Sequence, residues 1–196
     1  MADTPAAHKP ALRKRLRAAR EAHVAALPAA TRALLFRRPP APILALVPDG
    51  AIVGLYNAAP AEAPAGGYAR YFAEAGHRLA LPRMASRGAA MELALHTDPF
   101  GASDLVAGPY GIAQPAPEAP SLVPDILFVP LVGFTVEGQR LGQGGGHYDR
   151  WLAAHPHVPA VGLAWDAQLV DWLPLEPHDR PLTAVVTPTR FYGPFA

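Results

Sequence analysis

The stretch that decides the fold is the apolar run Asp125-Ile-Leu-Phe-Val-Pro130, followed shortly by Arg140-Leu-Gly-Gln-Gly-Gly-Gly-His-Tyr-Asp-Arg150. The first segment is typical of a buried strand. The second passes through four glycines into an amphipathic segment that begins near Tyr148. A strand, a glycine turn and a helix in this order let backbone N–H groups and a helix N-terminus face an anion. We therefore interpret the stretch as a phosphate site.

Each residue type in this loop has a physical use beside a phosphate. Glycine adopts positive φ and lets a ligand approach without a Cβ in the way. Arg140 offers a planar, permanently charged group that can bind two phosphate oxygens, and Asp149 supplies the hard oxygen that Mg²⁺ prefers there. The run matches neither standard nucleotide-binding glycine motif, so a flexible surface loop is the alternative.

Composition limits the possible classes of protein. The 196 residues are 51% hydrophobic and 17% charged, which favours an ordinary globular chain with one domain as the default. The net charge of +1 excludes a strong overall field for nucleic acid or anionic membranes. We expect no membrane segment, no signal peptide and a cytoplasmic location. The absence of cysteine removes disulfides, thiolate nucleophiles and sulfur-ligated zinc.

Short apolar runs alternate with helical periodicity along the chain, which predicts an α/β layered fold. In such sheets ligands bind at the carboxyl ends of the strands, where the glycine loop is expected. The segment 100–124 is rich in proline and glycine and is expected to be a long ordered loop. Helices are expected over 6–27, 28–38, 65–75, 148–154 and 167–172, and strands over 43–47, 52–56, 78–81, 92–96, 125–130, 158–164 and 183–187.

The first predicted helix carries four cations on one face. Lys9, Arg13, Arg17 and Arg20 recur at helical spacing beside an apolar stripe that contains Leu12 and Leu16. A solvated charged face is the simplest interpretation of such a pattern. Against it, Lys9 and Lys14 are the only lysines in a sequence that otherwise uses arginine.

Several blocks together resemble the 5-formyltetrahydrofolate cyclo-ligase (5,10-methenyltetrahydrofolate synthetase) family. The similarity extends in order over nearly the whole chain. The strand and glycine block is the specific part, whereas the N-terminal cations would mean little alone. The blocks are Lys9-x-x-x-Arg13, Tyr56 with Glu62, Leu81-Pro82, Gly111-Ile-Ala-Gln-Pro115, 125–134, 138–150, 168–174 and Glu176-Pro-His-Asp179.

The resemblance implies an enzyme that uses ATP and Mg²⁺ to close 5-formyltetrahydrofolate to 5,10-methenyltetrahydrofolate, releasing ADP and phosphate. It also implies one domain over 1–196 with a three-layer α/β/α, Rossmann-like fold, similar to the isomerase and CoA-transferase layer folds. The expected partners are the two small substrates, without nucleic acid or membrane, and the protein is expected to be a monomer. Phosphoryl transfer needs positioning and cations around the moving charge rather than covalent chemistry from the protein.

The family's functional residues transfer to this chain position by position. Catalytic roles are implied for Arg140 and Tyr148. Asp149 and Asp179 would hold Mg²⁺. ATP would contact Lys9, Arg13, Arg140, Leu141, Gly142, Gln143, Gly144, Gly145, Gly146, His147 and Tyr148. The folate would contact Asn57, Glu62, Gln143, Gly144, Gly145, Gly146 and His147.

A few positions depart from the common pattern of the family. Gly145 often aligns with lysine or glycine, and His147 with a tyrosine that can stack. Pro64 and Ala65 replace an acidic residue and a threonine, which affects the expected folate contacts near Glu62. Thr183 and Pro188 stand where aspartate and glutamate are usual.

Other candidate chemistries receive little support from the sequence. His155 and His157 lack partners at metal-ligand spacing, and Ser86, Ser103 and Ser121 lack a nucleophile-elbow context. His178 is expected to be a loop histidine or a partner of Asp179. Trp151, Trp165 and Trp172 are expected in the core, with Trp165 as a possible wall of the pterin pocket.

Two rival functions stay open on sequence grounds. A sugar-phosphate isomerase on a similar fold would use the glycine loop for phosphate but would not need ATP. A non-catalytic relative that binds folate or RNA would use the basic helix, and its RNA binding would depend on salt.

Overall fold

The computed structural model describes residues 5–176 and 179–195. Within these residues seven strands form one sheet in the order β11-β10-β9-β6-β1-β2-β3. Strands β10, β9, β6, β1 and β2 are parallel, and β11 and β3 add antiparallel edges. The strands are β1 (Ile52–Gly54), β2 (Arg78–Arg83), β3 (Glu92–His96), β6 (Ile126–Pro130), β9 (Ala160–Leu163), β10 (Ala184–Val186) and β11 (Phe191–Tyr192).

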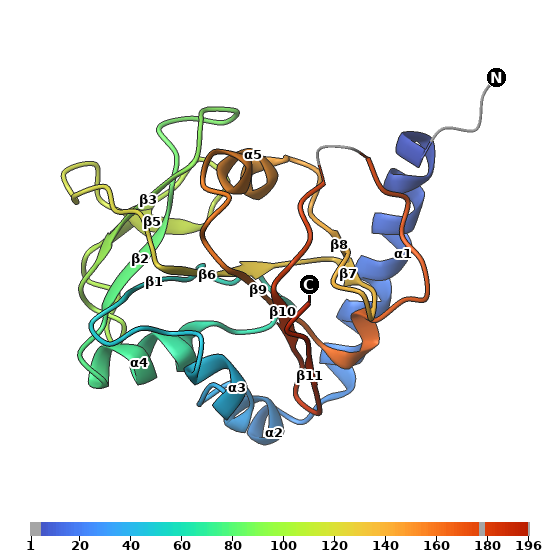
Figure 1. The fold of residues 1–196 in the computed structure, drawn as a ribbon, viewed down its shortest axis with the longest axis horizontal. Helices are drawn as coiled ribbons and strands as arrows, with labels where there is room; N and C mark the ends of the chain where they lie inside the picture. The colour runs from blue at the N-terminus through green and yellow to red at the C-terminus, as the bar shows by residue number, and fades with distance from the viewer. Residues whose placement is uncertain (1–4, 177–178, 196) are drawn as a thin grey trace.

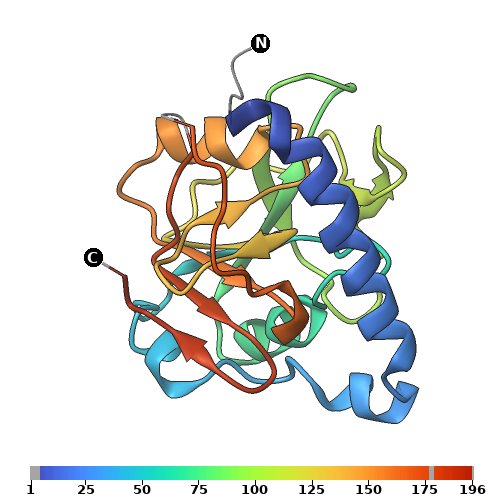
Figure 2. The same cartoon turned by 90° about the vertical axis from the view of Figure 1, so that its right-hand side faces the viewer.

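Helices cover both faces of this sheet, as the α/β prediction required (Figure 1). On one face lies α5 (His147–Ala154), and on the other lie α2 (Ala29–Leu34), α3 (Ala41–Leu44) and α4 (Gly66–Glu74). The long helix α1 (Pro5–Ala26) runs along one side of the molecule and contacts the short 3₁₀ turn η1 (Asp166–Gln168) (Figure 2). Within the described chain, no helix is long and apolar enough to span a membrane.

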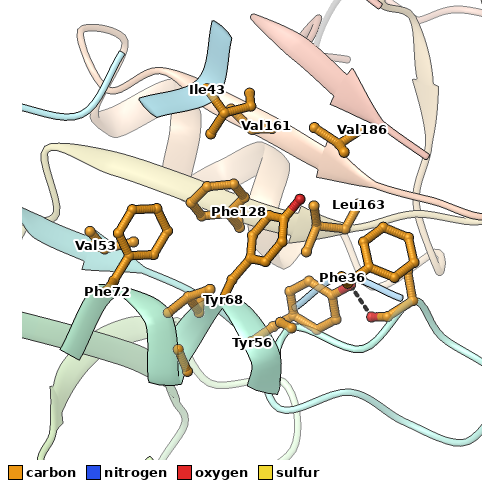
Figure 3. Packing of buried hydrophobic residues seen from close by; sticks show 14 of the residues in the cluster. Phe36, Ile43, Val53, Tyr56, Tyr68, Phe72, Phe128, Val161, Leu163 and Val186 are labelled. Carbon is orange, nitrogen blue, oxygen red and sulfur yellow. Dashed lines mark hydrogen bonds between the residues drawn. The ribbon is translucent and has the colours of Figure 1, made fainter. Parts of the chain in front are cut away.

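The central strand β6 explains why its sequence is a continuous apolar run. Ile126 and Phe128 pack into the core on the face of α4, while Leu127 and Val129 pack into the core beneath α5. A strand buried on both faces needs apolar residues at every position instead of alternation. Figure 3 shows Phe128 among the aromatic residues of the first core. Replacing a fully buried phenylalanine with alanine would cost about 3–5 kcal/mol of stability.

The structure corrects two predicted segments. Residues 43–47 were expected to form a strand, but the chain forms α3 over Ala41–Leu44, followed by a turn. Pro40 and Pro42 lie at the beginning of this helix, where proline is well tolerated, and Ile43 is fully buried in the core. A short apolar run does not by itself distinguish a strand from a buried helical turn.

The second correction concerns 100–124, which is not only a loop. It contains an antiparallel hairpin of β4 (Leu105–Ala107) and β5 (Ala113–Pro115). A second small ribbon pairs β7 (Gly133–Phe134) with β8 (Arg140–Leu141), and this ribbon and β11 were not predicted. The helix expected over 167–172 is the shorter η1. Strands of two or three residues are too short to show a clear period in sequence.

Candidate active site

The glycine loop lies where the sequence predicted, between β8 and α5. Gly144 and Gly146 have positive φ values of 106° and 64°, so glycine is required at both positions for the backbone conformation. Gly146 is the N-cap of α5. The N–H groups of the first turn of α5 therefore begin directly after the loop. This geometry agrees with the interpretation of the loop as an anion site.

A cavity of about 400 Å³ opens beside this loop. It lies at the carboxyl ends of β6, β1 and β2, because Pro130, Tyr56 and Pro82 line it. Strand β1 has β6 on one side and β2 on the other, so the cavity lies at the point where the strand order reverses. Its wall also includes Asn57, Glu62, Met84, Met91, Pro109, Tyr110, Ile112, Ala113, Gln114, Arg140, Gly142, Gln143, Gly145, Gly146, His147, Tyr148 and Asp149.

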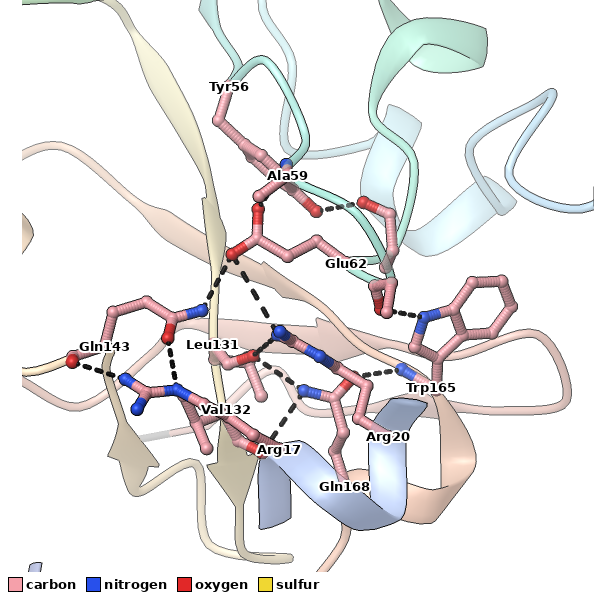
Figure 4. Close-up of polar contacts among 12 residues, drawn as sticks. Arg17, Arg20, Tyr56, Ala59, Glu62, Leu131, Val132, Gln143, Trp165 and Gln168 are labelled. Carbon is pink, nitrogen blue, oxygen red and sulfur yellow. Dashed lines mark hydrogen bonds and ion pairs between the residues drawn. The ribbon is translucent and has the colours of Figure 1, made fainter. Parts of the chain in front are cut away.

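The four cations that share one face of α1 are not simply solvated, because each contacts a distant segment. The Arg13 Nε group donates to the carbonyl oxygen of Gly142 at 2.9 Å. Arg17 donates to Gln143, and Arg20 lies 3.9 Å from the Glu62 carboxylate (Figure 4). Helix α1 therefore supports the glycine loop and the wall of the cavity. The prediction that Arg13 contacts ATP stays a prediction.

Lys9 pairs with two carboxylates of the C-terminal segment, and its predicted contact with ATP stays a prediction. Its Nζ donates to Glu176 at 2.7 Å and to Asp179 at 2.6 Å, and its side chain is only 6% exposed. Burial lowers the pKa of Lys9, but the hydrogen bonds and the negative charges of Asp179 and Glu176 together outweigh burial, so the net pKa is raised. The ammonium group thus holds the C-terminal segment against α1. Pro177 and His178 of the same motif lie outside the described residues.

Arg140 and Asp149 form an ion pair across the glycine loop. The Arg140 side chain is 2% exposed, and its buried Nε has no hydrogen-bond partner among the described residues. Asp149 lies in the first turn of α5 and also lines the cavity. The observed partner of Asp149 is a cation, and no group of three or more potential metal ligands occurs within the described part of the chain.

The charge of the Glu62 carboxylate acts on two tyrosines of the cavity wall, Tyr56 and Tyr148. Burial raises the pKa of Tyr148, the charge of Glu62 raises it further, and Arg140 opposes the increase. Burial and then Glu62 also raise the pKa of Tyr56 well above its ordinary value, and the Tyr56 hydroxyl donates to the carbonyl oxygen of Ala63. Tyr148 is therefore neutral at physiological pH and can donate a hydrogen bond into the cavity.

His147 joins the glycine loop to the β4–β5 hairpin. Its Nε2 lies 3.5 Å from the Tyr110 hydroxyl, and the two rings meet edge to face at 5.8 Å. The Arg150 guanidinium lies 3.2 Å from the Nδ1 of His147. Since arginine can only donate, Nδ1 accepts and Nε2 carries the proton. Burial and the charge of Arg150 lower the pKa of His147.

The structure shows which site residues the sequence missed. Met84, Met91 and Tyr110 received no role from the sequence, and Ile112 and Gln114 were named only as members of the Gly111–Pro115 block, yet all five line the cavity. Only the short Gly111–Pro115 block pointed to the hairpin. Asn57 and Glu62 do line the cavity, and the Asn57 amide donates to the carbonyl oxygen of Ala113 at 3.2 Å.

Trp165 belongs to the core rather than to the cavity wall. Its side chain is fully buried, and its indole N–H donates to the carbonyl oxygen of Ala61 at 3.0 Å. The prediction of a core residue is confirmed, and the alternative role beside a pterin is wrong. Trp172, which was also expected in the core, is 64% exposed.

Comparisons with known proteins agree with the expected family. The 5-formyltetrahydrofolate cyclo-ligase of Escherichia coli strain K12 is 42% identical over 124 residues, which are 60% of this chain and 67% of that protein. The cyclo-ligase of Mycolicibacterium smegmatis is 34% identical over 122 residues, 60% of this chain and 63% of that protein.

Solved structures share the fold. A 5,10-methenyltetrahydrofolate synthetase from Mycoplasma pneumoniae superposes with a TM-score of 0.66 at 22% identity, covering 90% of this chain and 96% of that one. The 5,10-methenyltetrahydrofolate synthetase of Aquifex aeolicus superposes with a TM-score of 0.65 at 24% identity, covering 95% of this chain and 93% of that one. The family model described as the 5-formyltetrahydrofolate cyclo-ligase family matches residues 5–188. The chain therefore belongs to the 5-formyltetrahydrofolate cyclo-ligase family.

Proposed function

We propose that the protein closes 5-formyltetrahydrofolate to 5,10-methenyltetrahydrofolate and converts ATP to ADP and phosphate, with the formyl oxygen leaving in the phosphate. Family membership carries this proposal, and one observation supports it: a single cavity joins the glycine loop to Asn57 and Glu62. An anion-binding loop and a pocket for a ring system must share one cavity if phosphate is to reach the folate. The same proximity would bring the two reactants into near-attack positions.

The chemistry requires activation of the formyl group, because amide resonance makes its carbon a poor electrophile. In the proposed mechanism the formyl oxygen attacks the γ-phosphorus of ATP, and the bond from phosphorus to ADP breaks. N10 then attacks the activated formyl carbon and loses its proton. Phosphate departs with the electron pair of the carbon–oxygen bond, which leaves the methenyl bridge between N5 and N10.

Residues of this chain have proposed roles in each part of the reaction. The loop amides and Arg140 would bind the phosphate oxygens. The neutral Tyr148 hydroxyl would donate a hydrogen bond to an oxygen of the transferred phosphate as negative charge develops on it. Glu62 and Asn57 would hold the folate ring. Lys9 and Arg13 are proposed to add positive charge around ATP. For Lys9 this requires that a phosphate group replace one of its two carboxylate partners, Glu176 or Asp179.

Mg²⁺ is proposed as the metal that accompanies ATP. Such an ion is usually held by one or two carboxylates together with phosphates and waters, so a cluster of protein ligands is not needed. Asp149 fits this requirement because it lines the same cavity as the glycine loop. Asp179 is paired with Lys9 and is not among the residues that line the cavity, so its proposed role depends on movement of that pair. When bound, the metal would neutralise phosphate charge.

A spectrophotometric assay with 5-formyltetrahydrofolate, ATP and Mg²⁺ tests the proposal, since the methenyl product absorbs distinctly. Product should form in step with ADP. Its absence above a no-enzyme control, with folded protein and fresh substrate, would refute the proposal. Activity that is indifferent to ATP would favour the isomerase alternative, and salt-dependent RNA binding without turnover would favour the binding protein. A monomeric state, a cytoplasmic location and the lack of a nucleic-acid partner stay predictions.

The metal ligands can be tested separately by measuring the initial rate against Mg²⁺ concentration at fixed ATP. We expect Asp149→Asn to lose most activity even at saturating Mg²⁺, and Asp179→Asn to recover part of its activity when Mg²⁺ is raised. If both variants titrate like the wild type, neither residue is a ligand.

A further inference from the structure

Gln143 is the one residue in the run Gly142–Gly146 that has a side chain, and it links two distant segments. Its Nε2 donates to Glu62 Oε1 at 2.8 Å. Its Oε1 accepts from Arg17 Nε at 2.9 Å, and its main-chain oxygen accepts from Arg17 Nη2 at 2.7 Å. Figure 4 shows this chain of contacts from α1 through the glycine loop to the segment after β1. Arg17 therefore contacts both the backbone and the amide of Gln143.

The Glu62 carboxylate is held from several sides but keeps capacity for a ligand. Its side chain is 7% exposed, its Oε2 accepts from the Ala59 N–H at 2.9 Å, and Arg20 lies 3.9 Å from its Oε1. An ionised carboxylate has about four acceptor positions, so it can accept from a ligand without releasing Gln143. Both Glu62 and Gln143 line the cavity. Gln143 thus orients the carboxylate that the folate is proposed to use.

We propose that Gln143 couples the two substrate sites, so that ATP and the folate bind with positive cooperativity. This inference rests on the proposed function. ATP orders the glycine loop, which places the Gln143 amide against Glu62 in the orientation that the folate needs. A folate bound at Glu62 holds the same hydrogen bond and thereby orders the loop.

The physical basis is the conformational entropy of the loop. Glycine loses more backbone freedom on ordering than any other residue, and four of the five residues in this run are glycine. The ligand that binds first orders the loop, so the second ligand binds with a smaller loss of entropy. Linkage requires the effect to be reciprocal, and each ligand must tighten the other by the same factor.

Isothermal titration calorimetry measures this factor directly. The probe is adenylyl imidodiphosphate, a non-hydrolysable ATP analogue, titrated with Mg²⁺ present, with and without saturating 5-formyltetrahydrofolate. For the wild type we expect the analogue to bind at least about fivefold more tightly with the folate present. The reverse titration should give the same factor.

Gln143→Glu is the first variant, because it keeps both acceptors for Arg17 and replaces the donor to Glu62 with a charged acceptor that cannot form this hydrogen bond. In this variant we expect the folate to tighten binding of the ATP analogue by no more than about twofold. This loss of coupling should be larger, in relative terms, than the change in the affinity for either ligand alone. Gln143→Ala provides the same measurement if the added carboxylate disturbs folding.

Gln114→Ala is the matched control. Gln114 also lines the cavity, but its amide bonds to the main chain of Met84, at 3.1 Å and 3.0 Å, rather than to the glycine loop. This variant should weaken folate binding while keeping the wild-type factor. A factor near one in the wild type, or an unchanged factor in the Gln143 variants, overturns the inference. A protein that binds neither ligand refutes the proposed function itself.

Discussion

Replacement of Asp149 by asparagine should destabilise the folded protein as well as slow the reaction. The Arg140 side chain is 2% exposed and the Asp149 side chain is 20% exposed. Because water hardly reaches the guanidinium, its positive charge is balanced mainly by the Asp149 carboxylate. A hydrogen bond to a charged group contributes about 1.5–3 kcal/mol, and breaking a buried ion pair costs about 3–5 kcal/mol. Asparagine keeps an acceptor, and water reaches Asp149. We therefore expect a loss of about 2 kcal/mol.

Thermal unfolding followed by circular dichroism is the assay. In a protein of this size, 1 kcal/mol shifts Tm by about 2–4 °C, so Asp149→Asn should unfold about 4–8 °C below the wild type. A double-mutant cycle with Arg140→Met isolates the ion pair. Asp171→Asn, at an exposed position, is the control and should change stability by no more than about 0.5 kcal/mol. An unchanged Tm for Asp149→Asn, or additivity within about 0.5 kcal/mol in the cycle, would refute the reasoning.

Three further predictions concern the same loop. Gly144→Ala should raise KM for ATP about tenfold or more, because the residue has φ of 106° and its Cβ would meet the Arg13 guanidinium at 3.4 Å. Gly66→Ala, at a position with an ordinary φ, is the control. An unchanged KM for Gly144→Ala would show that the loop only connects β8 to α5. In steady-state kinetics, Arg140→Ala should lower kcat/KM by about one to two decades, and Arg150→Ala should lower it by much less. Small, equal effects of the two substitutions would show that Arg140 does not bind the phosphate. NMR titration should place the pKa of His147 below 6.5, and Arg150→Ala should raise it towards that value. Because the folded-state pKa is the lower one, the stability linked to His147 is fully present above about pH 6.5 and is lost as pH falls; an unshifted pKa in the wild type would contradict the observed environment.

Sequence alone located the parts of the site that depend on local chemistry. The run Ile126–Pro130 predicted a buried strand, and the glycines after it predicted the positive φ values that Gly144 and Gly146 adopt. The alternation of short strands and helices predicted the α/β fold. These features depend on neighbouring residues and on burial, both of which leave a pattern in a single segment.

Tertiary structure decided which charges meet. The spacing of Lys9, Arg17 and Arg20 showed only that they share a helix face. Lys9 donates to Glu176, 167 positions away, and Arg17 donates to Gln143, 126 positions away. Arg20 lies beside Glu62 and donates to the carbonyl oxygen of Leu131, 111 positions away. Arg140 and Asp149 were both placed beside phosphate by the sequence, but their ion pair follows from how β8 and α5 pack. The β4–β5 hairpin reaches the cavity for the same reason. Contacts between residues far apart in sequence leave no local period, so only the packed fold determines how the cations of α1, the glycine loop and the wall of the cavity are connected.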